Sequence, residues 1–153
     1  MDLQFAFEVN RQTRKNILRS VEGLTEKQIN TIPEGFKNNI AWNFGHILIM
    51  QQLLFYTMSG NEPMVSKEMI DKYKKGNRPT NNITIEEFDE LKELYVKSID
   101  KAEEDYNSGL FSGYQPYQTS YGINIDTIED VIQFIYAHDA LHWGIILSML
   151  KVI

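Results

Sequence analysis

The chain contains no cysteine, and this absence excludes several kinds of chemistry at once. Without cysteine there is no disulfide, no thiolate nucleophile and no sulfur ligand for a metal ion. Long apolar runs are also missing, because no uninterrupted stretch approaches the ~18 residues that a membrane span needs. We therefore expect no segment within a membrane, and any metal site must use nitrogen or oxygen ligands.

Positive charge is scarce as well. The chain has 15 Lys and Arg residues against 21 Asp and Glu residues, a formal net charge of −6, and no Lys/Arg cluster offsets it. This balance argues against a nucleic-acid partner held by phosphate contacts. Met1 to Phe5 lack the basic and apolar regions of a signal peptide, so we expect a cytoplasmic protein. Its 153 residues, 42% of them hydrophobic, are typical of one domain over 1–153.

Hydrophobic periodicity predicts an all-α protein with four long helices. Apolar residues recur at helical spacing over four segments: 3–21, 39–58, 85–106, and a final helix that starts at the cap Asp126–Glu129. Capping-box spacings begin the third helix at Thr84–Glu87 and a short helical turn at Thr25–Gln28. The second segment is apolar nearly all round, which is typical of a central helix.

Two long connections, 60–83 and 109–125, separate these helices. Their Gly, Pro and Asn content predicts a connection with room for a short helix, followed by a loop or small hairpin. Bundle loops are usually ~2–8 residues, so both connections indicate crossovers and an up-down-down-up four-helix bundle. Tyr114, Tyr117 and Tyr121 in the second connection either line a substrate mouth or, as we favour, pack on the end of the bundle.

Several residues interrupt the predicted helices. Polar Asn10 and Arg14 fall on the apolar face of the first helix. Arg11 and Arg14 either reach an anionic substrate or, as we favour, lie on a solvated face. Gly45 and Gly144 fall inside helices, where glycine costs about 1 kcal/mol relative to alanine. Close helix packing at both glycines would explain them.

The three histidines of the chain occupy positions where the pattern calls for apolar residues. His138 and His142 continue the inward seam of the last helix, whose other members are Ile128, Val131, Ile135, Ile145 and Met149. Their i, i+4 spacing puts both rings on one face, within reach of one metal ion, and His46 lies in a second apolar segment. An unpaired buried polar group costs about 1–3 kcal/mol, so these rings need partners. We favour a divalent metal over hydrogen bonds to the backbone or Asp139.

The neighbours of the histidines exclude other metal sites. Di-iron bundles need Glu-x-x-His, but Asn43, Ile135 and Asp139 stand three residues before the histidines, and three histidines are too few for a hemerythrin-like site. Asp139 follows His138 where zinc proteases carry Glu, yet it is shorter and lies about 100° around the helix. We expect Asp139 either to support a ligand or to be exposed, and Asn43, one turn before His46, is a similar supporting candidate.

Two motifs resemble those of DinB/YfiT-like proteins. Residues 39–47 (Asn-Ile-Ala-Trp-Asn-Phe-Gly-His-Ile) are similar to the Trp-x-x-Gly-His signature of that family, and residues 137–146 are similar to its closing His-x-x-x-His-x-Gly helix. The stretch 24–29 and the spacing of the motifs also match. This resemblance implies a four-helix bundle of unusual connectivity with one divalent ion, zinc or nickel, held by His46, His138 and His142. It also implies a possible homodimer.

The resemblance narrows the function to two classes. Family members include transferases and isomerases that use low-molecular-weight thiols, and metal-dependent hydrolases. It therefore implies a metal-dependent enzyme acting on a small-molecule substrate by thiol transfer or hydrolysis, with a low-molecular-weight thiol as a possible cofactor. The alternative is a non-catalytic, stress-related metal-binding bundle. No residue beyond the three histidines matches a catalytic motif, so the sequence predicts no catalytic side chain.

Overall fold

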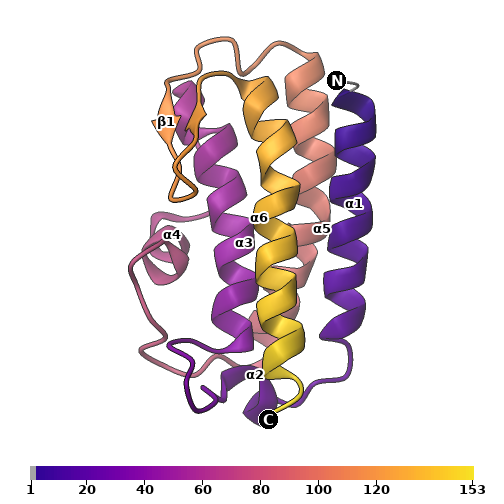
Figure 1. The fold of residues 1–153 in the computed structure, drawn as a ribbon, viewed down its shortest axis with the longest axis vertical. Coiled ribbons are helices and arrows are strands. Elements are labelled where there is room, and N and C mark those ends of the chain that lie inside the picture. The colour runs from indigo at the N-terminus through magenta and orange to yellow at the C-terminus, as the bar shows by residue number, and fades with distance from the viewer. Residues whose placement is uncertain (1–2) are drawn as a thin grey trace.

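The computed structural model describes residues 3–153 and arranges them as a helical bundle (Figure 1). The four long helices are α1 (Leu3–Ser20), α3 (Ile40–Phe55), α5 (Ile85–Asn107) and α6 (Ile128–Met149). The smaller elements are α2 (Glu26–Asn30), a 3-10 turn (Thr57–Ser59), α4 (Lys67–Tyr73), β1 (Tyr117–Gln118) and β2 (Asn124–Ile125). The two strands pair antiparallel as a small hairpin. The predicted all-α fold is confirmed.

Side-chain caps set where the helices begin. Capping boxes open α2 at Thr25 and α5 at Thr84, as predicted. The cap of α6 is Thr127 rather than Asp126, because the Thr127 hydroxyl accepts from the backbone of Asp130, whose carboxylate accepts from the Thr127 backbone N–H in return. The predicted helix over 39–58 ends earlier, at residue 55, and continues as the 3-10 turn.

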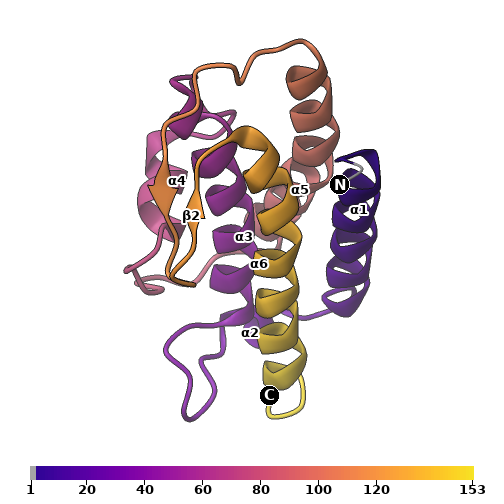
Figure 2. The ribbon, with the colours of Figure 1, turned by 45° about the horizontal axis from the view of Figure 1, so that its top comes forward.

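The four long helices follow the predicted up-down-down-up order. In Figure 1, α1 and α6 descend while α3 and α5 ascend, so α3 and α6 are antiparallel. Helix α6 packs against α1 and α3, and α5 packs against the same two helices on the other side. The first long connection carries α4 along the outside of α3, and the second places the hairpin beside the upper half of α3, as Figure 2 also shows.

Two hydrophobic clusters fill the bundle, and α3 contributes to both. Phe44 of α3 contacts Phe88 and Tyr95 of α5, with ring centroids 5.2 and 4.7 Å apart. Phe55, at the other end of α3, meets Phe111 edge to face at 5.7 Å. Helix α3 is therefore the buried central helix that its composition predicts. No helix among residues 3–153 is long and apolar enough to span a membrane.

The polar interruption of α1 is buried rather than solvated. Arg14 is only 2% exposed, so the favoured interpretation of a solvated Arg14 is wrong. Its guanidinium donates to the Tyr95 carbonyl at 2.9 Å, to the Ser98 hydroxyl at 2.7 Å and to the Asp139 carboxylate at 3.3 Å. Arg11 does lie at the surface, where it pairs with Asp100. Arg14 thus ties α1 to α5 and α6 in the core.

Candidate metal centre

The fold brings the three histidines together. His46 comes from α3, and His138 and His142 come from α6. One ring nitrogen from each lies within 4.8 Å of the others, and within residues 3–153 this is the only such group of three or more His, Asp or Glu side chains. The ring centroids are 4.7 to 5.4 Å apart. His46 and His138 are buried, while His142 is partly exposed.

The ring of His46 is held in one orientation. Its Nδ1 lies 2.7 Å from the backbone carbonyl oxygen of Tyr73 in α4. A carbonyl can only accept, so Nδ1 carries the proton and Nε2 keeps its lone pair. The ring also stacks on Trp42, with centroids 4.6 Å apart and an angle of 11° between the planes. This arrangement leaves Nε2 of His46 as the free ligand atom.

Asn43 fixes His142 in the same manner. The Asn43 amide nitrogen donates to Asn38 Oδ1 and to the Asn39 carbonyl, both at 2.8 Å. These two bonds determine which end of the amide is oxygen, and that oxygen lies 2.9 Å from Nδ1 of His142. Nδ1 therefore donates, which leaves Nε2 free. Asn43, predicted from its position one turn before His46, thus contacts His142 instead.

His138 lies against a buried carboxylate. Its Nδ1 is buried and lies 3.6 Å from Asp139 Oδ1, and neither atom has a hydrogen-bond partner among residues 3–153. Asp139 is fully buried, so the alternative that it is exposed is wrong. Its other oxygen accepts from Arg14 across the helix interface. The three imidazoles together fit a divalent ion that prefers nitrogen ligands.

Burial keeps the free nitrogens unprotonated at neutral pH. Desolvation, together with a smaller effect of the nearby His138 and His46, lowers the pKa of His142 to about 3. Desolvation likewise lowers the pKa of His46 to about 4, against a smaller opposing effect of the hydrogen bond to Tyr73. Both rings are therefore neutral at pH 7, which is the form that binds a metal.

The metal-free protein should lose stability as the pH falls below about 6.5. The unfolded chain takes up protons on these histidines near pH 6.5, whereas folded His46 and His142 resist protonation down to about 4 and 3. Each histidine should therefore contribute a slope of about 1.4 kcal/mol per pH unit to the free energy of unfolding. Urea unfolding of EDTA-treated protein between pH 7 and 5 measures it. His46→Gln should flatten the slope, and a flat wild-type profile would contradict buried, neutral rings.

A pocket of about 90 Å³ opens above the histidines. Both long connections contribute to its wall, the first through Lys75 and the second through Tyr117, Thr119, Ser120 and Tyr121. The remaining wall is apolar and consists of Met50, Leu54, Phe134 and Leu141. Tyr117 and Tyr121 thus line the pocket, because the hairpin folds back beside α3 and α6. Tyr114 and Tyr117 also pack against the hydrophobic core, as favoured from the sequence, and the Tyr114 hydroxyl is buried. The favoured interpretation is therefore wrong only for Tyr121.

The two helical glycines differ. A Cβ at Gly45 would lie 2.5 Å from the Tyr73 ring, so the expected close packing is present there. Gly144 is exposed, and a Cβ would meet no atom within 4 Å, so close packing at Gly144 is wrong. Gly45 therefore lets α4 approach α3, and this approach brings the Tyr73 carbonyl to His46.

Substituting these two glycines should have opposite effects. Gly45→Ala should lower the free energy of unfolding by about 1–3 kcal/mol, because the methyl group overlaps the Tyr73 ring. Gly144→Ala should raise it by up to about 1 kcal/mol, because alanine favours the helix and the space is open. Chemical denaturation of both variants measures the difference. Equal effects would show that Tyr73 does not pack against α3 as described.

The comparisons with known proteins agree with this geometry. The family model of the DinB superfamily matches residues 10–146, which include most of all four long helices and all three histidines. No curated protein matches the chain. The match supports the resemblance that the two histidine motifs indicate. It specifies no activity, so the chemistry depends on the geometry of the site.

Proposed function

The chain belongs to the DinB superfamily, and we propose that it is a metal-dependent enzyme that acts on a small molecule. In this proposal His46, His138 and His142 hold one divalent ion, zinc or nickel. The reaction is transfer of a low-molecular-weight thiol, or hydrolysis. The observation that carries the proposal is the pocket that opens directly above the three histidines.

The ligand set favours a catalytic site over a structural one. Structural zinc sites are closed by four protein ligands, whereas catalytic sites have three and keep one position open. Among residues 3–153 no fourth His, Asp or Glu joins the group, and Asp139 is paired with Arg14. When bound, the metal would act as a Lewis acid that lowers the pKa of a water or thiol at the open position. The stress-related, non-catalytic alternative lacks such a supporting observation.

The pocket wall suggests what the substrate carries. Lys75 lines the pocket and no Asp or Glu from the described part of the chain does, so the wall attracts an anionic or electron-rich group. Tyr117, Tyr121 and Ser120 offer hydroxyl groups, and the Thr119 hydroxyl already donates to the Ile123 carbonyl. Apolar side chains cover the other side. We infer a small substrate with an apolar part and a negatively charged end held near Lys75.

An activity screen tests the proposal. Zinc- and nickel-loaded protein is assayed with glutathione, bacillithiol or cysteine plus a haloaromatic electrophile, and separately with ester and amide substrates. Turnover that needs the thiol supports a transferase, and turnover without it supports a hydrolase. His142→Ala should abolish either activity. Lys75→Ala should raise KM for anionic substrates, whereas Lys74→Ala, whose ammonium pairs with Asp71, should not.

A negative result is equally informative. If neither set of substrates is turned over by metal-loaded protein, and spectroscopy of a cobalt-substituted sample shows a fourth protein ligand, the enzymatic proposal fails. The non-catalytic bundle would then be the better description. The homodimer and the cytoplasmic location stay predictions from the sequence.

A further inference from the structure

A narrow cavity lies beside Trp42, near the start of α3. Its volume is about 10 Å³. The walls come from α2, α3 and α4 and from the end of the first long connection, and their polar members include Asn30, Asn39, Thr80 and Asn81. None of the residues that line this cavity also lines the pocket above the histidines. We call it the Trp42 cavity.

The indole N–H of Trp42 is a buried donor without a partner. Trp42 is only 7% exposed, and its Nε1 makes no hydrogen bond within residues 3–153. The other tryptophan of the chain differs, because Trp143 Nε1 donates to the Ser20 hydroxyl at 2.9 Å. Buried N–H groups normally have an acceptor, either in the protein or in an ordered water. Nε1 is the only polar atom of the indole, so Trp42 can bind a polar ligand in the cavity only through this nitrogen.

Hydrogen bonds hold the walls of the Trp42 cavity in place. Asn30 brackets Ile83, because its amide nitrogen donates to the Ile83 carbonyl at 2.8 Å and its Oδ1 accepts from the Ile83 N–H at 2.9 Å. Asn39 Oδ1 accepts from the backbone N–H of Trp42 at 2.8 Å, and its amide nitrogen donates to the Asn30 carbonyl at 3.1 Å. The cavity is therefore preformed, and these two side-chain oxygens already have donors.

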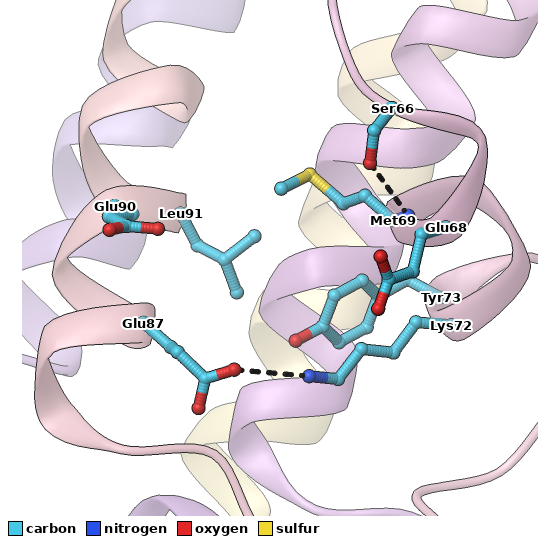
Figure 3. Close-up of a pocket in the computed structure, with 8 residues that line it drawn as sticks. All are labelled: Ser66, Glu68, Met69, Lys72, Tyr73, Glu87, Glu90 and Leu91. Atoms are coloured by element: carbon cyan, nitrogen blue, oxygen red, sulfur yellow. Dashed lines mark hydrogen bonds and ion pairs between the residues drawn. The ribbon is translucent and has the colours of Figure 1, made fainter.

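Two other polar side chains at the cavity extend elsewhere. Figure 3 shows Lys72 and the Tyr73 hydroxyl in the neighbouring space between α4 and α5, where the Lys72 ammonium lies 3.6 Å from the Glu87 carboxylate. An ammonium also has no lone pair with which to accept the indole proton. Thr80 and Asn81 line the cavity and carry side-chain oxygens, which can accept hydrogen bonds from a bound ligand.

The size of the Trp42 cavity selects its ligand. A cavity needs about 10–15 Å³ to hold one water molecule, so this cavity lies at the lower limit and excludes any larger ligand. A water can accept from the indole N–H and still donate two hydrogen bonds of its own. We propose that the Trp42 cavity binds one buried water, which accepts from Trp42 Nε1 and donates to oxygen atoms of residues 79–83. This water joins the start of α3 to the first long connection.

Trp42 connects the water to the candidate metal centre. Its ring stacks on the His46 ring, with centroids 4.6 Å apart and an angle of 11° between the planes. A hydrogen bond at Nε1 restrains the indole and therefore supports this stack. We expect loss of the bond to lower zinc affinity by up to about tenfold, the lower end of the range for residues that contact a metal ligand. This consequence rests on the proposed metal site, whereas water binding does not.

A crystal structure of the full chain tests the proposal directly. An ordered water should lie about 2.7–3.2 Å from Trp42 Nε1 and make a second hydrogen bond to residues 79–83. Trp143 is the internal control, because its Nε1 should keep the Ser20 hydroxyl as acceptor. In crystals of Trp42→Phe the ring should still stack on His46, and the water should be lost. A cavity without water, or a protein oxygen bonded directly to Trp42 Nε1, would overturn the proposal.

Amide hydrogen exchange gives a second readout in solution. The Ile83 N–H, which donates to Asn30 Oδ1, reports on opening of residues 79–83. Its exchange should be about fivefold faster in Trp42→Phe, the factor expected for the loss of one hydrogen bond. Trp143→Phe is the matched control and should leave this rate unchanged, because Trp143 donates to a protein hydroxyl instead. Equal acceleration in the two folded variants would contradict a water bridge from Trp42.

The link to the metal centre has its own test. Zinc affinity is measured for wild type, Trp42→Phe and Trp143→Phe by competition with a chelator. A weaker affinity in Trp42→Phe alone supports the link. An unchanged affinity in Trp42→Phe would overturn the link even if the crystal structure contains the water.

Discussion

Protein purified without chelator should carry about one divalent metal ion per chain, and His138→Ala should carry almost none. The reason is the donor set: the chain has three histidines and no cysteine, and all three histidines converge. With only three protein ligands, loss of any one leaves two, too few for a stable site. Elemental analysis of the purified protein and of the three single alanine variants measures the stoichiometry.

A substitution at Asn43 distinguishes binding of the metal by a histidine from the orientation of that histidine by a neighbouring residue. Asn43→Ala keeps all three histidines but removes the oxygen that accepts from His142 Nδ1, so metal affinity should fall about 10–100-fold without loss of stoichiometry at saturation.

Chelator should also lower the melting temperature, since metal at a hundredfold excess over Kd adds about 2.7 kcal/mol to the free energy of unfolding. Full metal content in a His46→Ala, His138→Ala double variant would rule out the trio as the metal site.

Local signals in the sequence were sufficient to predict the long helices and where they begin. The capping boxes at Thr25 and Thr84 are read within four residues, and the structure contains both. The apolar surface of α3 predicts its central position, because a helix without a polar face has to be covered on all sides. The long connections predict crossovers, since short loops would have forced antiparallel neighbours.

The contacts around the histidines could not be predicted in this way. The i, i+4 spacing places His138 and His142 on one face, but nothing local shows that Tyr73, 27 residues after His46, supplies the carbonyl to its ring. Lys75 likewise lines the metal pocket because of the path of the first long connection. That connection has no regular hydrophobic periodicity from which its path could be predicted. These positions depend on how α4 packs on α3. A signal was available at Gly45, where a glycine inside a helix indicated a close neighbour.

Arg14 illustrates a second limit of prediction from sequence, which concerns buried charges. A polar residue on an apolar helix face is usually explained by exposure, and the partner that makes burial favourable here is Asp139, 125 residues away. Asp139 is adjacent to His138, so its charge could be assigned to the metal site from sequence, but its pairing with α1 could not. The buried ion pair between Arg14 and Asp139 could therefore be recognised only from the packing of α1 against α6 in the folded structure.

Breaking this buried ion pair should have the largest effect on stability. Asp139→Ala or Arg14→Ala leaves a charge in the core without its partner, since both side chains are at most 3% exposed. We expect each to lower the free energy of unfolding by about 3–5 kcal/mol. The matched control is Asp100→Ala, which removes an ion pair of Arg11 at the surface, where Asp100 is 61% exposed, and should cost less than about 1 kcal/mol. Urea denaturation compares the three variants with the wild type.

Replacing both charges separates the structural role of the pair from its effect on His138. An Arg14→Met, Asp139→Leu variant removes both charges together, so it should regain most of the stability that either single change loses. It also removes the carboxylate that faces His138 Nδ1 at 3.6 Å. Metal affinity should therefore stay reduced about 10–100-fold although the fold recovers, because a carboxylate beside a ligating histidine orients the ring and raises its basicity. If affinity recovered together with stability, the pair would serve only to join α1 to α6, and Asp139 would have no influence on the metal centre.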